Sequence, residues 1–189
     1  MTQKKNLLTV LFALALSAAF MGCSDDEQPA FEYKSQGYVK GTLTGTSKDG
    51  SYVFNEKFNY TQYSLALGET ASTYTLNAGG SYSITIARAD YNGSGSAHID
   101  FLLSNASDKS PEDIDYYFYL VKEDKDKFIQ FDMSDDADNT VTIPEADFSF
   151  DPTTGRVKGK YTISGADNST DKNATITGEF DVIAKKIVQ

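Results

Sequence analysis

The sequence is poor in the residues that most metal and nucleophilic sites require. Its 189 residues include one cysteine, one histidine and no tryptophan. One cysteine cannot form an intrachain disulfide, and together with one histidine it cannot supply the usual Cys and His ligands of a zinc site. Packing, rather than cross-linking, therefore has to stabilise the fold.

Basic residues are also scarce. The chain has 17 Lys and Arg against 27 Asp and Glu, a net charge of −10. Residues 1 to 22 hold Lys4, Lys5 and no acid, so the remaining chain carries 15 basic and 27 acidic residues, a net charge of −12. Such a protein is repelled by nucleic acid and by anionic lipid surfaces, because both are themselves negatively charged. We therefore exclude a nucleic-acid partner.

The apolar run over residues 7 to 20 is too short to cross a bilayer, which takes roughly 18 apolar residues or more. It follows Lys4 and Lys5 and leads to the small Gly22, directly before the only cysteine, Cys23. A cationic start, a short apolar stretch and a small residue at the cleavage point are typical of a secretory signal peptide. Residues 1 to 22 are predicted to be removed.

The residues around the cleavage point carry a family resemblance. Phe20-Met21-Gly22-Cys23 is similar to the lipobox of bacterial lipoproteins, with Phe20 where Leu is usual. The polar run that follows resembles the surface-export signal of Bacteroidetes lipoproteins; it consists of Ser24, Asp25, Asp26 and Glu27. The resemblance covers residues 1 to 27. It implies that Cys23 is lipidated, that the lipid anchors the protein in the outer membrane, and that the domain behind it is exposed on the cell surface.

Behind the cysteine the chain divides into a tether and one domain. Residues 23 to 37 are acidic and polar, contain Pro29 and lack apolar periodicity, which is typical of a linker. Residues 38 to 189 have the length of a single domain. Their apolar residues recur with period two and are interrupted by Gly, Asn, Asp and Ser clusters, so we predict an all-β domain.

Two hairpins near the ends of this domain share a pattern of glycines and aromatic residues. In residues 38 to 46 and 52 to 60, the turn Asp49-Gly50 predicts a two-residue connection. This register sets Gly45 opposite Phe54 and Gly41 opposite Phe58. In the last hairpin, pairing Ile163 with Ile176 sets Tyr161 opposite Gly178 and Phe180 opposite Gly159. An aromatic ring then covers each missing side chain, an arrangement called aromatic rescue.

The other candidate strands lie between these two hairpins, and we predict that about nine or ten strands form in all. They are expected at residues 81 to 89, 96 to 103, 115 to 122, 127 to 133, 141 to 143 and 148 to 150, with one or two edge strands between residues 61 and 77. This number needs two packed sheets or a closed barrel. We expect a two-sheet antiparallel β-sandwich, because the two similar hairpins could each join a different sheet. A lipocalin-like β-barrel is the alternative.

The histidine does not form a catalytic triad with its neighbours. Ser96, His98 and Asp100 share one face of a strand, and same-face neighbours stand about 7 Å apart, too far for the hydrogen bond from nucleophile to base. We expect His98 at the surface, bonded to Asp100. The domain is therefore interpreted as non-catalytic, although a glycosidase using a pair of carboxylates is left open, since carboxylate separation depends on tertiary structure.

One acidic connection offers oxygen ligands of the kind that calcium prefers. It contains Asp132, Asp135, Asp136 and Asp138. The spacing is not that of an EF-hand, because the sixth position counted from Asp136 is Val141, where glycine is required. Solvent-exposed loops account for the same composition, so no cofactor is expected and calcium remains an alternative.

The strand at residues 115 to 122 is apolar on both faces. One of its faces and the same face of the next strand carry the ligand-binding candidates Tyr117, Tyr119, Gln130 and Asp132. Pairing Lys122 with Lys127 would set Tyr119 opposite Gln130 and Tyr117 opposite Asp132. Flat rings for stacking beside hydrogen-bonding groups suit a glycan. The alternative is a central strand whose second face is covered by a loop.

Two functions follow from these patterns. The first is a surface lipoprotein that binds a glycan or another extracellular ligand. The second is a structural or protein-interaction lipoprotein of an envelope assembly, acting through a sheet edge or loop surface.

The anchor can be tested by replacing Cys23 with alanine. The variant should move from the membrane fraction to the soluble fraction, because a lipid chain can no longer be attached. Cell fractionation measures this, with Ser24→Ala as the control that keeps the cysteine. A Cys23→Ala variant that stays tightly bound to membranes would contradict the lipoprotein interpretation.

Overall fold

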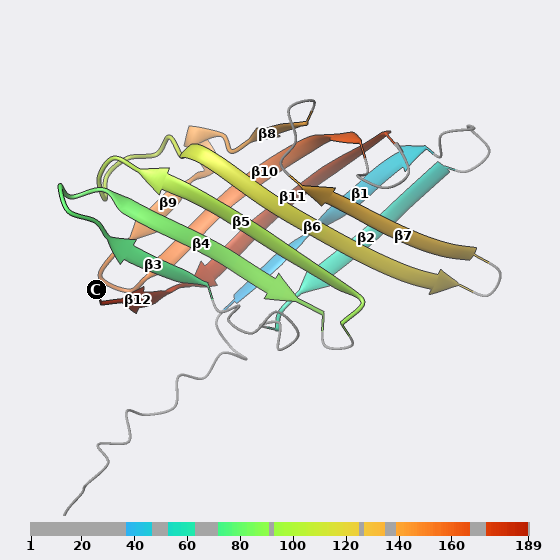
Figure 1. Cartoon of the computed structure of the whole chain (residues 1–189), viewed down its shortest axis with the longest axis horizontal. Coiled ribbons are helices and arrows are strands. Elements are labelled where there is room, and N and C mark those ends of the chain that lie inside the picture. Colours follow the sequence, from blue (N-terminus) through green and yellow to red (C-terminus); the bar gives the residue numbers. More distant parts are fainter. Residues whose placement is uncertain are drawn as a thin grey trace, which may run out of the picture. The chain divides into compact units, whose positions relative to one another are not determined.

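The computed structural model describes residues 37–46, 53–62, 72–90, 93–124, 127–134, 139–166 and 173–188, with the backbone alone at 54, 122–124 and 127–129. The predicted signal peptide, the lipobox with Cys23, the export signal and the turn Asp49-Gly50 lie outside these residues. Within them, no helix is long and apolar enough to cross a membrane. The described residues form an all-β sandwich of two sheets, as predicted (Figure 1).

Sheet 1 contains six strands in the order β2, β1, β11, β10 and β8, with β9 also paired to β10. Their bounds are β1 (Gly37–Thr46), β2 (Val53–Tyr60), β8 (Thr140–Thr142), β9 (Ser149–Asp151), β10 (Arg156–Ala166) and β11 (Asn173–Ile183). All pairs in this sheet are antiparallel. A single 3₁₀ turn, Glu145–Asp147, connects β8 to β9.

Sheet 2 contains six strands in the order β12, β3, β4, β5, β6 and β7. Their bounds are β3 (Thr73–Leu76), β4 (Tyr82–Ala89), β5 (Gly95–Leu103), β6 (Glu112–Asp124), β7 (Lys127–Ser134) and β12 (Lys185–Ile187). The chain passes from sheet 1 to sheet 2 at Ala184, and β12 then runs parallel to β3. Among the described strands, no pairing joins the two sheets into a closed ring, so the lipocalin-like alternative is wrong.

The described residues form twelve strands, more than the nine or ten expected. The ranges predicted from the sequence correspond to β1 to β11; the strand that was not predicted is β12, which has three residues and follows β11 after a single residue. The pairing of β12 with β3 also places β3 inside the sheet, whereas the sequence predicts an edge strand there. No turn residues separate β12 from β11, so the sequence pattern gives no sign of a new strand there.

The two similar hairpins lie in the same sheet, so the expectation that they join different sheets is wrong. β1 pairs with β11 along its whole length, from Gly37 opposite Val182 to Thr46 opposite Asn173. This pairing sets Gly41 directly opposite Gly178. Two neighbouring glycines leave a gap on the inner face, which rings from the strands on either side can fill.

The register within each hairpin agrees with the sequence prediction. Gly41 and Gly45 lie opposite Phe58 and Phe54, and Tyr161 and Phe180 lie opposite Gly178 and Gly159. A Cβ atom built at Gly159 would lie 2.4 Å from Cζ of Phe180, and one at Gly178 would lie 2.6 Å from the hydroxyl oxygen of Tyr161. The rings therefore occupy the space of the missing side chains, and aromatic rescue is confirmed at these two glycines.

Phe180→Ala should lower the free energy of unfolding by about 3 to 5 kcal/mol, because it deletes a fully buried ring. The ring is 1% exposed and stacks on Tyr161 with the ring centres 6.2 Å apart. Urea unfolding measures the change. Val53→Ala, at a strand position that is 71% exposed, is the control and should change stability by less than about 0.5 kcal/mol. A loss below about 1 kcal/mol for Phe180→Ala would contradict the packing described here.

Candidate functional site

The four predicted ligand-binding residues lie on the outer face of sheet 2. Along β6, Phe118 and Leu120 are buried in the core, so Tyr117 and Tyr119 point the other way. Gln130 and Asp132 share that face on β7. Both tyrosines are half-buried and Gln130 is exposed. The structure thus brings the four candidates together.

The predicted register between these strands is wrong by two residues. Tyr119 lies opposite Asp132, and Tyr117 lies opposite Ser134. The ladder extends to Asp124 paired with Lys127, so two residues connect the strands, whereas the sequence predicts a connection of four, from Glu123 to Asp126. Two-residue connections are the commonest in hairpins, and the charged residues Glu123 and Asp124 extend β6. A register shift of two residues keeps every side chain on its predicted face of the sheet, so the four candidates still share one face.

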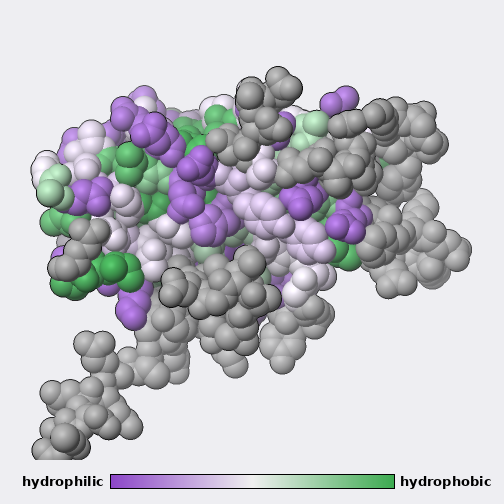
Figure 2. Space-filling model, viewed as in Figure 1, coloured by the Kyte–Doolittle hydropathy of each residue, from purple (hydrophilic) through white to green (hydrophobic). Residues whose placement is uncertain are grey.

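The neighbouring strand β5 adds residues whose proximity to the tyrosines the sequence pattern does not indicate. Ser96 lies opposite Tyr119, and His98 lies opposite Tyr117. We call the six residues the tyrosine platform: Ser96, His98, Tyr117, Tyr119, Gln130 and Asp132. Polar residues thus flank the two rings on both sides. Figure 2, which views the molecule from the side of sheet 2, shows pale residues of intermediate hydropathy beside hydrophilic ones across this face.

A buried tyrosine of sheet 1 is hydrogen-bonded to the strand that carries the two platform tyrosines. Tyr60, at the end of β2, is 3% exposed and donates a hydrogen bond of 3.0 Å to the backbone carbonyl of Tyr119. Gly95 makes this approach possible, since a Cβ atom there would lie 2.2 Å from the Tyr60 hydroxyl oxygen. Burial, and then the charge of Asp90, raises the pKa of Tyr60 far above its usual value, so it stays a donor. The β6 backbone under Tyr119 is therefore fixed by the opposite sheet.

Tyr117 and Asp132 interact across the strands. Partial burial, then the charge of Asp132 and a hydrogen bond to its carboxylate, raise the pKa of the Tyr117 phenol. The phenol is therefore protonated at neutral pH and donates to Asp132. This contact holds the ring of Tyr117 beside an acceptor that has further lone pairs.

His98 contacts Asp100 through Nε2 and Oδ2, 2.6 Å apart, which confirms the contact predicted from the sequence. Thr85 donates to the other oxygen of Asp100 at 2.5 Å. Burial of Asp100 raises its pKa, but the hydrogen bonds from His98 and Thr85 outweigh it, so the pKa lies below its usual range. Because an ionised carboxylate only accepts hydrogen bonds, Nε2 of His98 carries the proton. The free ring nitrogen, Nδ1, is then an acceptor when His98 is neutral.

The calcium candidates fall mostly outside the described residues. Asp135, Asp136 and Asp138 lie there, and Asp132 belongs to the tyrosine platform. In the ranges that the structure does describe, no three His, Cys, Asp or Glu side chains are grouped to hold a metal ion. The calcium alternative therefore stays a prediction.

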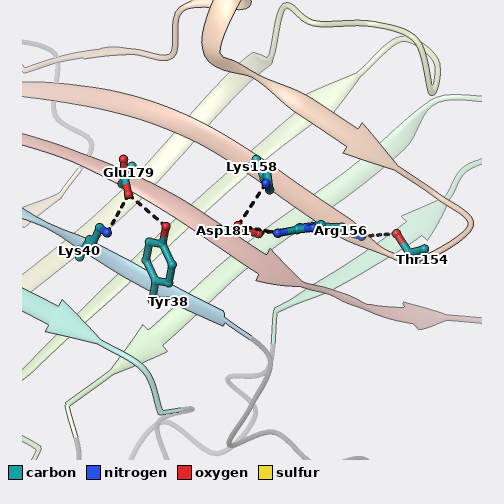
Figure 3. A network of polar contacts seen from close by, with 7 residues as sticks. All are labelled: Tyr38, Lys40, Thr154, Arg156, Lys158, Glu179 and Asp181. Carbon is teal, nitrogen blue, oxygen red and sulfur yellow. Dashed lines mark hydrogen bonds and ion pairs between the residues drawn. The ribbon is translucent and has the colours of Figure 1, made fainter.

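The outer face of sheet 1 carries a network of charged residues that the sequence did not reveal. Arg156 forms two hydrogen bonds with Asp181, of 2.9 and 2.8 Å, and Lys158 lies 3.4 Å from the same carboxylate (Figure 3). Glu179 accepts from Tyr38 at 3.0 Å and from Lys40 at 2.9 Å. Hydrogen bonds from Arg156 hold the pKa of Asp181 below its usual range, although partial burial opposes this. The partners come from β1, β10 and β11, so only the sheet order could bring them together.

Replacing Asp100 by asparagine should lower the free energy of unfolding by about 1 kcal/mol at neutral pH, since two hydrogen bonds to a half-exposed charge weaken. The folded-state pKa is depressed, so the stabilisation is present above the unfolded pKa of about 3.9 and is lost as the pH falls through the folded value. Urea unfolding at several pH values, with Glu112→Gln as the exposed control, tests this. A difference from wild type that is unchanged from about pH 7 to pH 3 would argue against it.

Comparison with known proteins gives no relative: no family model, no curated protein and no solved structure matches the chain. Function therefore has to be inferred from the geometry and chemistry of the described surfaces.

Proposed function

We propose that the protein is a lipid-anchored cell-surface lipoprotein whose non-catalytic β domain binds a glycan through the tyrosine platform. One observation carries the proposal. Tyr117 and Tyr119, two half-buried tyrosines of one strand, lie on an outer sheet face with hydrogen-bonding side chains on both neighbouring strands. Lipidation of Cys23 and surface export rest on the residues around the cleavage point.

The chemistry of the platform suits a sugar. A sugar ring has an apolar C–H face that packs on an aromatic ring and hydroxyl groups at its edge that need partners. Asp132 can accept from such hydroxyls, and the exposed amide of Gln130 can both donate and accept. These groups lie on the strand next to the rings, so one ligand can reach both kinds of contact.

No catalytic step is part of the proposal. His98 is engaged by Asp100, and Asp132 is engaged by Tyr117, so these groups orient the face of the platform. The bond to Tyr117 leaves the Asp132 carboxylate with acceptor capacity, since a carboxylate can accept about four hydrogen bonds. Binding of this kind needs no metal and no cofactor.

A second candidate function has its own observation. Leu76, Ile187 and Val188 are 45%, 41% and 84% exposed and lie on or beside β3 and β12, at one end of sheet 2. Within the described residues, β12 pairs on one side only. An open edge with apolar side chains is suited to pairing with a strand of another protein. An accessory protein of an envelope assembly would use this edge in place of the platform.

Tyr119→Ala should weaken glycan binding about fivefold or more, because stacking of a flat ring on an aromatic side chain contributes roughly 1 to 3 kcal/mol in the case of nucleic-acid bases. The melting temperature should change little, since the ring is half exposed. A glycan array of the mature domain identifies the probe, and isothermal titration of the best neutral oligosaccharide measures the affinity.

Two variants serve as controls in this experiment. Tyr119→Phe keeps the ring and should keep most of the affinity, and Tyr38→Ala removes a half-buried tyrosine from the other sheet. If Tyr119→Ala lowers the melting temperature strongly and leaves the affinity unchanged, the ring is a packing residue and the edge candidate is favoured. The same conclusion follows if the domain binds no glycan on the array.

A further inference from the structure

The outer face of sheet 1 contains a shallow hollow over strands β2, β1 and β11. Its volume is about 640 Å³, within the roughly 300 to 1,000 Å³ of small-molecule sites. The side chains on the outer face that line it are polar: Lys40, Thr42, Lys57, Asn59, Thr177 and Glu179. Between them lie the paired glycines Gly41 and Gly178, and Phe58 also lines the hollow. A lining of ammonium, hydroxyl, amide and carboxylate groups suits a polyhydroxylated ligand.

The hollow has one positive charge in excess. The ammonium of Lys40 is paired with Glu179 at 2.9 Å and lies 4.4 Å from the centre of the Tyr38 ring (Figure 3). Lys57 is exposed, and among the described residues its ammonium has no hydrogen bond and no ion pair. A lone cation at the rim of a hollow can bind one anionic group of a ligand. This stands out in a chain whose net charge is −10.

A row of hydroxyl groups leads away from Lys57 across the sheet. Cross-strand pairing sets Lys57 beside Thr42, and the row continues through Thr177, Thr162 and Thr142. At a strand spacing of about 4.8 Å, the four threonines span roughly 14 Å. None of their four hydroxyls is hydrogen-bonded to another described residue.

The neighbouring row of hydroxyl groups on the same face is hydrogen-bonded within the sheet. It contains Thr44, Thr175, Ser164 and Thr140. Thr44 donates to the backbone carbonyl of Thr175 at 3.3 Å, Ser164 and Thr175 lie 3.3 Å apart, and Thr140 donates to the carbonyl of Ser164 at 3.4 Å. The strand preference of threonine explains why both rows exist. The row next to Lys57 is the one whose hydroxyls are left available to a ligand.

We propose that this face binds an oligosaccharide that carries a single acidic sugar. The carboxylate of the acidic sugar pairs with Lys57 in the hollow, and the neutral sugars lie along Thr42, Thr177 and Thr162. A polyanion is not favoured, because the net negative charge of the protein repels it, whereas one charge held at Lys57 interacts mainly within the Debye length of about 8 Å. This site is on the opposite sheet from the tyrosine platform and does not depend on it.

The test is a titration of the mature domain with sialyllactose, a trisaccharide with one carboxylate, and with lactose, its neutral core. A glucuronate-containing trisaccharide distinguishes a general carboxylate site from one specific for sialic acid. Both acidic probes, or one of them, should bind at least about tenfold more tightly than lactose. Backbone amide signals of Lys57, Thr42 and Thr177 should shift in the NMR spectrum.

Variants locate the site. Lys57→Gln should lower the affinity for the acidic probe about tenfold, and Lys109→Gln, an exposed lysine of the loop between β5 and β6, should leave it unchanged. Thr177→Val should lower it about threefold, while Thr175→Val in the bonded row should not. In the Tyr119→Ala background, Lys57→Gln should still lower the affinity for the acidic probe about tenfold, which separates this site from the tyrosine platform.

Several outcomes would overturn the proposal. They are no binding of either acidic probe, lactose binding as tightly as the acidic probes, equal losses for Lys57→Gln and Lys109→Gln, or loss of binding in Tyr119→Ala with none in Lys57→Gln. The substituted lysines and Thr177 are exposed, so melting temperatures close to wild type should confirm that these variants fold.

Discussion

The structure depends on a row of four residues on the inner face of sheet 1: Phe58, Gly41, Gly178 and Tyr161. Their backbones pair across β2, β1, β11 and β10, so two glycines lie side by side with an aromatic residue on each flank. The glycines remove two side chains from the centre of the sheet, and the rings lie over that gap. Phe58 then also contacts Phe118 of sheet 2, with ring centres 4.8 Å apart. One pattern therefore fixes the register of four strands and contributes to the packing between the sheets.

Fixing the inner face of sheet 1 also fixes its outer face, because neighbouring residues of a strand point to opposite sides. With Gly41 inward, Lys40 and Thr42 must point outward; with Gly178 inward, Thr177 and Glu179 must do so. The charged network and the hydroxyl rows are thus direct consequences of the glycine positions. The same inner face also contacts sheet 2. Tyr60 follows Phe58 by two residues, lies on the same face and donates a hydrogen bond to the backbone of Tyr119. The candidate site on one sheet is in this way supported by the other.

The two outer faces differ in chemistry. The face of sheet 2 combines two half-buried tyrosines with Asp132, Gln130 and the pair formed by His98 and Asp100. The face of sheet 1 carries lysines, an arginine and threonines, and most of its charges form ion pairs with one another or with Asp147 of the 3₁₀ turn. A sandwich core leaves both faces available, so one domain can present two unlike surfaces. Stacking is suited to the first surface, and hydrogen bonding with one charge is suited to the second.

The sequence by itself determined the all-β class, the face on which each side chain of the main strands lies, and the register of the two glycine-containing hairpins. These follow from local rules, namely alternation and the need to cover a missing side chain. Only the tertiary structure decided that both hairpins belong to one sheet, that β12 covers β3, and that Tyr119 faces Asp132. The β6 and β7 pair has no glycine to distinguish one register from another shifted by two, since both keep the same faces. Contacts such as Arg156 with Asp181, or Ser96 beside Tyr119, join strands through the sheet order, and sheet order depends on long-range packing that local alternation does not encode.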